Sequence, residues 1–266
     1  MTTAGGSVVP LATASCLRQG WRAFGQAPLR FMAFTLLGGV LNVIGQLVQN
    51  RGSDELQQGG PAGYLLLALG GLAAGVASNI WLNVGLLRGS RIALAEGQPR
   101  FAELARWEGA ATLRLLGMAA LLLMVNGLVL ITCGLVAGVL SVLTPGLGLL
   151  ALVLGGAALM ILNVSQVFQL PLVVVGRLGP VLAFQRGWSR KTRGWAPLYL
   201  LTLALHGLQV LLVLLVPTPF AALAVLLAVG LLIAWPVMIA SLMAGYDALF
   251  GRDFGRGGTA QAFSER

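Results

Sequence analysis

The side chains best suited to chemistry in this sequence are nine amides and one imidazole that lie inside long uncharged stretches. An amide that faces lipid alone is costly, so we expect these groups to face one another or the interior of a helix bundle. Two interpretations stay open, namely hydrogen bonds between helices and the lining of a polar cavity or pathway. The residues are Asn42, Gln46, Asn79, Asn83, Asn126, Asn163, Gln166, Gln169, His206 and Gln209.

The sequence offers little for catalysis. It contains no HExxH, P-loop or GxSxG motif, and Ser141, Ser165 and Ser241 lack the flanking glycines of a nucleophilic serine. Only His206 could titrate near neutral pH inside an uncharged stretch, and Asp247 lies near the end of the last one. Ion-coupled carriers usually keep a buried ionisable group. We therefore expect no enzyme, no cofactor and no catalytic or metal site.

The elements that position these residues follow from composition. Of the 266 residues, 58% are hydrophobic and 9% are charged, and the formal net charge is +9. A soluble domain carries about a quarter charged residues, and a disordered chain needs low hydrophobicity. The composition excludes both classes and indicates an all-α polytopic membrane protein, because lipid cannot satisfy a bare backbone and alternating barrel strands are missing.

Four stretches contain no Asp, Glu, Lys or Arg, namely 31–50, 56–87, 115–176 and 194–246. About 20 apolar residues cross a bilayer core, so the first two stretches hold one span each. The last two hold two spans each, divided at Thr144-Pro145-Gly146 and Pro217-Thr218-Pro219. The predicted six spans are 29–48, 62–87, 113–143, 147–175, 196–216 and 220–249.

The basic residues predict the orientation. With six spans, 16 of the 17 Lys and Arg residues share the side of the two termini, and only Arg51 lies opposite. By the positive-inside rule both termini are cytoplasmic. Residues 1–15 show no cleavable signal peptide. A single lysine among so many arginines suggests a GC-rich bacterium, so we expect the bacterial inner membrane, with a thylakoid or organelle membrane as the alternative.

A short amphipathic stretch precedes each odd-numbered span. Such stretches suit helices that lie in the membrane interface, and the alternative is a cytoplasmic loop with some helix. Their basic side chains lie where anionic headgroups or a membrane-protein partner would bind, and we expect no nucleic-acid partner. The predicted contacts are Arg18, Arg22, Arg186, Arg190, Lys191 and Arg193.

Internal similarity predicts three repeated helix pairs. Gly25-Gln26-Ala27-Pro28-Leu29 matches Gly194-Trp195-Ala196-Pro197-Leu198, and half of that offset places Asn42 on Asn126, Asn79 on Asn163 and Gly71 on Gly155. The third unit is more diverged. Units with an even number of spans share one orientation, so we expect a pseudo-threefold bundle. The predicted units, about 11–87, 99–175 and 181–249, form one domain (1–266) that ends in a short cytoplasmic tail, 251–266.

The segment Leu170-Pro171-Leu172-Val173-Val174, with Gly179-Pro180, Ala183-Phe184, Gly187-Trp188 and Thr192-Arg193-Gly194, carries a family resemblance. It resembles the six-helix membrane domain of some bacterial glycerophosphoryl diester phosphodiesterases and its stand-alone uncharacterised relatives. The resemblance implies six spans with an amphipathic helix before each odd-numbered one. In those enzymes a separate soluble domain performs catalysis, and only Gly251 to Arg266 follow the sixth span here, so the activity is not expected.

Three hypotheses follow. The first is a non-enzymatic scaffold, assembly or membrane-organising factor with a basic cytoplasmic face. The second is a transporter or channel for a small or amphiphilic solute, which would use the intramembrane amides. The third is an intramembrane hydrolase, which would need a serine or an acid within hydrogen-bond reach of His206.

Overall fold

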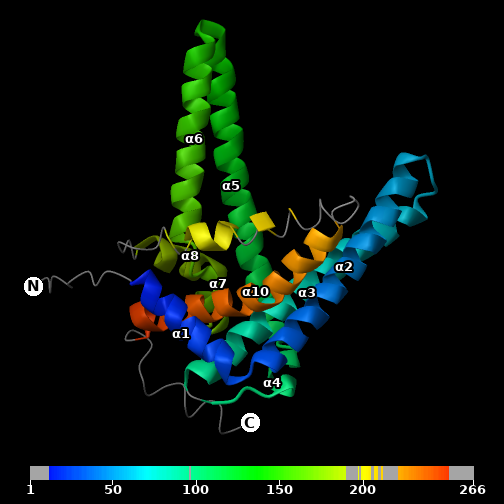
Figure 1. The fold of residues 1–266 in the computed structure, drawn as a ribbon. Helices are drawn as coiled ribbons and strands as arrows, with labels where there is room; N and C mark the ends of the chain where they lie inside the picture. Colours follow the sequence, from blue (N-terminus) through cyan, green and yellow to red (C-terminus); the bar gives the residue numbers. More distant parts are fainter. Residues whose placement is uncertain are drawn as a thin grey trace, which may run out of the picture. The chain divides into compact units, whose positions relative to one another are not determined.

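The computed structural model describes residues 12–95, 97–189, 197, 199–204, 207–208, 211 and 221–251. All regular secondary structure within these residues is helical, which confirms the predicted all-α class. Five helices within this described part of the chain are long and apolar enough to cross a membrane. The elements, in chain order, are α1 Thr13–Gln26, α2 Pro28–Gln57, α3 Gly63–Leu94, α4 Phe101–Ala105, α5 Gly109–Leu143, α6 Pro145–Ser165, α7 Gln169–Val174, α8 Pro180–Ser189 and α10 Ala221–Phe250 (Figure 1).

The chain divides into two compact units. One contains the described parts of Ala14–Thr112 and Leu201–Ala248, and therefore α1 to α4 and most of α10. The other contains the described parts of Leu113–Leu200, with most of α5 and all of α6, α7 and α8.

In the first unit, α2 and α3 form an antiparallel hairpin that turns at Gly59, whose φ of +80° favours glycine (Figure 1). Glycines let the two backbones approach closely. A Cβ at Gly45 would lie 2.7 Å from the backbone nitrogen of Gly75, and one at Gly52 would lie 2.5 Å from that of Ala68. Close approach of this kind drives helix association in lipid, where apolar burial between helices contributes little.

At the opposite end of the hairpin, an aromatic core joins α2, α3 and α4. The rings of Phe34 and Trp81 meet edge to face at 4.7 Å between centroids, and Phe34 also meets Phe101 at 6.0 Å. Leu104 of α4 is fully buried, because Gly85 and Gly89 of α3 present no side chain in front of it. These contacts hold a helix of only five residues in place.

Helix α1 packs on α10 through a strip of small and apolar residues. Cys16, Gly20, Ala23 and Phe24 are buried along one face of α1. A Cβ at Gly20 would lie 2.8 Å from the carbonyl oxygen of Val237, so the two backbones nearly touch at this point. The amphipathic helix predicted before the first span therefore exists and is docked on a described part of the chain.

In the second unit, α5 and α6 form a long hairpin that turns at Thr144 and Pro145 (Figure 1). Pro145 occupies the start of α6, where its missing N–H costs no helical hydrogen bond. The two helices approach closely at Gly148 and Gly155, whose Cβ atoms would lie 2.8 Å from Cβ of Ser141 and 2.6 Å from Sγ of Cys133.

The predicted span at 147–175 is wrong in its second part, because α6 ends at Ser165 and α7 begins only at Gln169. Pro171 explains the break. In a continuous helix it would leave the carbonyl of residue 167 without a donor and clash with it. Restarting the helix at Gln169 places Pro171 in the first turn, where no intrahelical donor is needed.

Several predictions fall outside the described residues. These include most of the predicted span 196–216, the turn Pro217-Thr218-Pro219, and the tail after Gly251.

Replacing Gly45 by leucine should separate α2 from α3, because the new side chain would meet the backbone of Gly75. Overpacking of this kind costs about 1–3 kcal/mol. Thermal unfolding of the purified protein in detergent measures the loss. The matched control is Gly39→Leu, since Gly39 lies on the same helix and has nothing within 4 Å of its Cβ position. Equal melting temperatures for the two variants would contradict the close-packed hairpin.

Candidate functional site

The amides of the first hairpin bond to helix backbone and to each other. Asn42 Nδ2 donates to the carbonyl of Gly75 across the α2–α3 interface at 3.1 Å. Gln46 Nε2 donates to Asn42 Oδ1 at 2.7 Å, one turn along α2. Asn83 Nδ2 donates to the side chain and carbonyl of Asn79 at 2.8 and 2.9 Å, within α3. The predicted cluster therefore contains one interhelical contact here, and Asn79 and Asn83 bond within their own helix.

The second hairpin contains a direct amide pair. Asn163 Nδ2 donates to Asn126 Oδ1 at 2.9 Å, joining α6 to α5, and also to the carbonyl of Leu159. Asn126 Nδ2 donates to the carbonyl of Leu122 one turn earlier. Both side chains are half-buried, and the two Nδ2 groups and Asn126 Oδ1 form their hydrogen bonds within the two helices themselves.

Gln166 lies at the end of α6 and joins that helix to α8. Its side chain is 2% exposed, and Nε2 donates to Ser165 Oγ at 3.0 Å and to the carbonyl of Phe184 at 3.2 Å. Gly187 of α8 lies directly against this amide. Gln169, from the same predicted set, begins α7, whereas His206 and Gln209 lie outside the described residues.

The predicted headgroup contacts are only partly described. Arg18 and Arg22 are exposed on α1, and Arg186 is exposed on α8. Arg190, Lys191 and Arg193 belong to the part of the chain that the structure does not describe.

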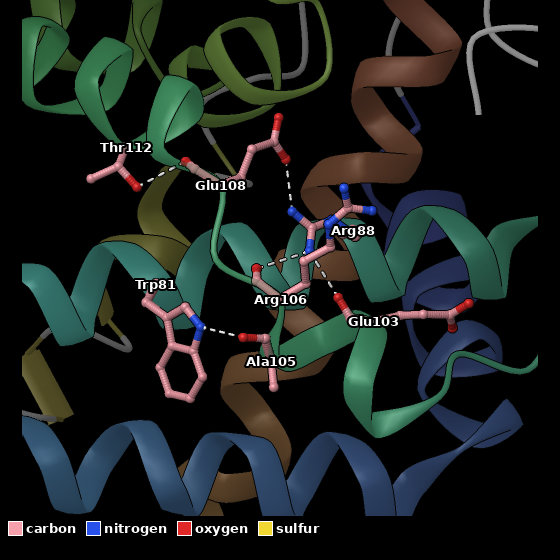
Figure 2. Close-up of polar contacts among 7 residues, drawn as sticks. All are labelled: Trp81, Arg88, Glu103, Ala105, Arg106, Glu108 and Thr112. Atoms are coloured by element: carbon pink, nitrogen blue, oxygen red, sulfur yellow. Dashed lines mark hydrogen bonds and ion pairs between the residues drawn. The ribbon is translucent and has the colours of Figure 1, made fainter. Parts of the chain in front are cut away.

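Three arginines bind backbone carbonyls, a role that the sequence analysis did not assign. Arg88 of α3 is the most extensive case (Figure 2). Its Nη1 donates to the carbonyls of Glu103 and Arg106 at 2.8 and 3.0 Å, and its Nη2 bonds to Glu108 Oε2 at 2.7 Å. Because the carbonyls of a helix end have no intrahelical donor, Arg88 closes the end of α4 and fixes the connection into α5.

Trp81 completes this cluster from one face of α3, where its Nε1 donates to the carbonyl of Ala105 at 2.8 Å (Figure 2). The other two arginines stand at corresponding places in the two hairpins. Arg30 Nη1 donates to the carbonyl of Pro99 at 3.0 Å, and Arg114 Nε donates to that of Val173 at 3.2 Å. In each case an arginine near the start of the first helix binds the segment that follows the second helix.

Two cavities stand out in the first unit, and both have mainly apolar walls. One of about 340 Å³ lies between α1, α10 and Leu201, with Trp21 and Gly230 among its lining residues. The other, of about 400 Å³, runs along α2 and α3 beside Ser78 and Trp81. Neither is lined by a predicted asparagine or glutamine.

Within the described residues, no three His, Cys, Asp or Glu side chains gather where a metal ion could bind. Searches with the chain found no match among protein-family models, curated proteins or solved structures.

Replacing Arg88 by methionine should lower the free energy of unfolding by about 1.5–3 kcal/mol, the range for hydrogen bonds to a charged group. The side chain is 14% exposed, so water replaces little of what is lost. The control is Arg51→Gln, which removes an i,i+4 ion pair whose arginine is 70% exposed and should cost less than about 0.5 kcal/mol. Unfolding in detergent compares the two, and equal losses would contradict the clamp.

Cys16 should react slowly with a maleimide at neutral pH. Its side chain is 2% exposed, and burial raises the pKa of the thiol above its ordinary value. The reactive thiolate therefore forms only at higher pH than in an unfolded chain. Labelling rates in a Cys133→Ala background, measured against pH with and without denaturant, provide the test. A native rate equal to the denatured rate would show that α1 is not docked on α10.

Proposed function

We propose that the chain is a non-enzymatic integral membrane protein of the bacterial inner membrane that acts as a scaffold, assembly or membrane-organising factor and binds anionic lipid on a basic cytoplasmic face. The observation that carries the proposal is the arrangement of side chains around α1. The five apolar helices are compatible with the multi-pass part of this proposal.

Helix α1 presents three kinds of surface in turn around its axis. Its small face packs on α10, with Gly20 at the closest point. Beside that face, Trp21 is 61% exposed, and Arg18 and Arg22 follow on the outer side, also exposed. Tryptophan beside arginine on a docked amphipathic helix matches the chemistry of the headgroup region, where indole rings and cations are both stable.

Helix α8 shows the same kinds of surface. Ala183 and Gly187 are buried, whereas Val181 is 62% and Trp188 is 42% exposed, and Arg186 lies among them on the exposed side. Arg190, Lys191 and Arg193 follow α8 in the sequence. We therefore assign α1 and α8 to the membrane interface.

We also propose six spans in three repeated pairs, with both termini cytoplasmic. Contacts at the 84-residue offset support the repeat. A side chain at Gly71 would meet the backbone of Gln49, and one at Gly155 would meet Cys133, which are equivalent positions. Arg30 and Arg114 are equivalent as well, and each binds a carbonyl after the second helix of its pair. The fifth span, 196–216, completes the third pair in this proposal.

The intramembrane amides have a structural role in this proposal. Asn42 bonds to the partner helix backbone, and Asn126 bonds to Asn163, so these polar atoms are already used inside the hairpins. Such bonds contribute about 0.6 kcal/mol each on average in membranes. The resemblance to the membrane domain of glycerophosphoryl diester phosphodiesterases stays a prediction.

Neutralising Arg186, Arg190, Lys191 and Arg193 together to glutamine should weaken anionic-lipid association by at least about tenfold, because each basic residue near a membrane surface contributes about 1 kcal/mol. The measurement is the preference of the reconstituted protein for spin-labelled phosphatidylglycerol over phosphatidylcholine at low salt. Arg51→Gln is the control, since the proposed topology places Arg51 on the opposite side of the membrane. An unchanged preference in the fourfold variant would refute lipid binding at this face.

A further inference from the structure

An apolar groove lies beside the α1–α10 contact, and its position relative to the arginines of α1 indicates what could bind in it. The groove has a volume of about 340 Å³, within the range of about 300–1,000 Å³ that ligand pockets show. Leu17 and Trp21 of α1 form one wall, and Gly230, Ile233 and Ala234 of α10 form another.

The chemistry of the groove restricts its occupant to an apolar chain. Its lining residues are all apolar and include no charged residue. The α10 wall belongs to a helix segment, Leu227–Phe250, that is apolar enough to cross a membrane. A polar ligand would lose its hydration there without compensation, whereas a hydrocarbon chain would not.

Gly230 lines the groove on the α10 side. It is exposed, and no atom lies within 4 Å of the position that a Cβ would take. Any larger residue here would project its side chain into that space.

Two arginines of α1 lie next to the groove-lining residues in the sequence. Arg18 follows Leu17 and Arg22 follows Trp21, so each arginine lies about 100° further around α1 from a groove-lining residue, on the exposed side. Guanidinium groups bind phosphate through paired hydrogen bonds. An apolar groove with two exposed arginines on the same helix as one of its walls therefore complements a molecule that has an anionic phosphate head and a hydrocarbon tail.

We propose that this groove binds one anionic phospholipid, with an acyl chain between Trp21 and Gly230 and the phosphate at Arg18 and Arg22. The inference rests on the proposed function and names a specific lipid site within it. Bound lipid would fill the space between α1 and α10 beside the Gly20 contact and so join the amphipathic helix to a membrane-spanning one.

Native mass spectrometry of the full-length protein, titrated in detergent with phosphatidylglycerol and separately with phosphatidylcholine of the same acyl chains, tests the site. The wild-type protein should retain one molecule of phosphatidylglycerol in preference to phosphatidylcholine. Gly230→Leu should weaken this binding at least tenfold by filling the groove. Gly39→Leu, a glycine-to-leucine change on α2 where nothing lies within 4 Å, should leave it unchanged.

A second variant tests the contribution of the lipid headgroup separately from that of the acyl chain. Arg18→Gln with Arg22→Gln should reduce the preference for phosphatidylglycerol over phosphatidylcholine by about five-fold per arginine, while weak binding of phosphatidylcholine persists. Slow maleimide labelling of Cys16 in each variant would show that α1 is still docked.

Three results would overturn the site. The first is phosphatidylglycerol binding by Gly230→Leu that is as strong as that of the wild type. The second is equal binding of the two lipids by the wild-type protein. The third is a wild-type protein that retains no lipid, which would mean that another part of the chain fills the groove. Loss of lipid preference in the fourfold α8-side variant together with unchanged binding in Gly230→Leu would refute the groove and leave the proposed function standing. An unchanged lipid preference in the fourfold variant, together with unchanged lipid binding in Gly230→Leu, would refute both the groove and the proposed function.

Discussion

Helices in a hydrocarbon solvent must associate without the hydrophobic effect, and this constraint governs the structure. Lipid tails solvate leucine as well as another helix does, so contact is favourable only where backbones come close enough for dense packing and hydrogen bonding. Both hairpins meet this requirement in the same way. Gly45 and Gly52 bring α2 against α3, Gly148 and Gly155 bring α6 against α5, and one asparagine contact crosses each interface.

The uncharged stretches of the sequence predicted the positions of α2, α3, α5 and α10, because hydrocarbon excludes charged groups most strongly. They predicted the ends of α5 and α10 to within one residue, but α2 and α3 continue well beyond their predicted ends. Helix α2 has 30 residues, or about 45 Å, which exceeds the bilayer core of about 30 Å. Arg51 and Glu55 continue it as an i,i+4 ion pair, so charge marks the edge of the apolar stretch and not the end of the helix. The fourth span was overextended because Pro171 interrupts a stretch that remains apolar throughout.

The polar residues were harder to place than the helices. Sequence alone could not distinguish Asn163, which reaches a partner helix, from Asn83, which bonds one turn back within α3. Both are asparagines in apolar surroundings, and only the rotation of each helix about its axis separates them. Prediction from the sequence has the same limit for the arginines. A count of charges cannot distinguish Arg88, which binds carbonyl oxygens of the chain, from Arg18, whose side chain is exposed.

This division among arginines follows from the unsatisfied carbonyls at helix ends and connections. Arg30, Arg88 and Arg114 each lie near the segment that follows a helix hairpin, where such carbonyls would otherwise lack a donor. Helix α1 instead lies along α10 through Gly20, and Arg18 and Arg22 extend from its outer side. The groove beside that contact could not be predicted from α1, because its second wall comes from Gly230 and its neighbours, some 200 residues later in the chain. The backbone therefore uses the arginines at its own connections, and our proposal assigns phosphate binding to those on the amphipathic helix.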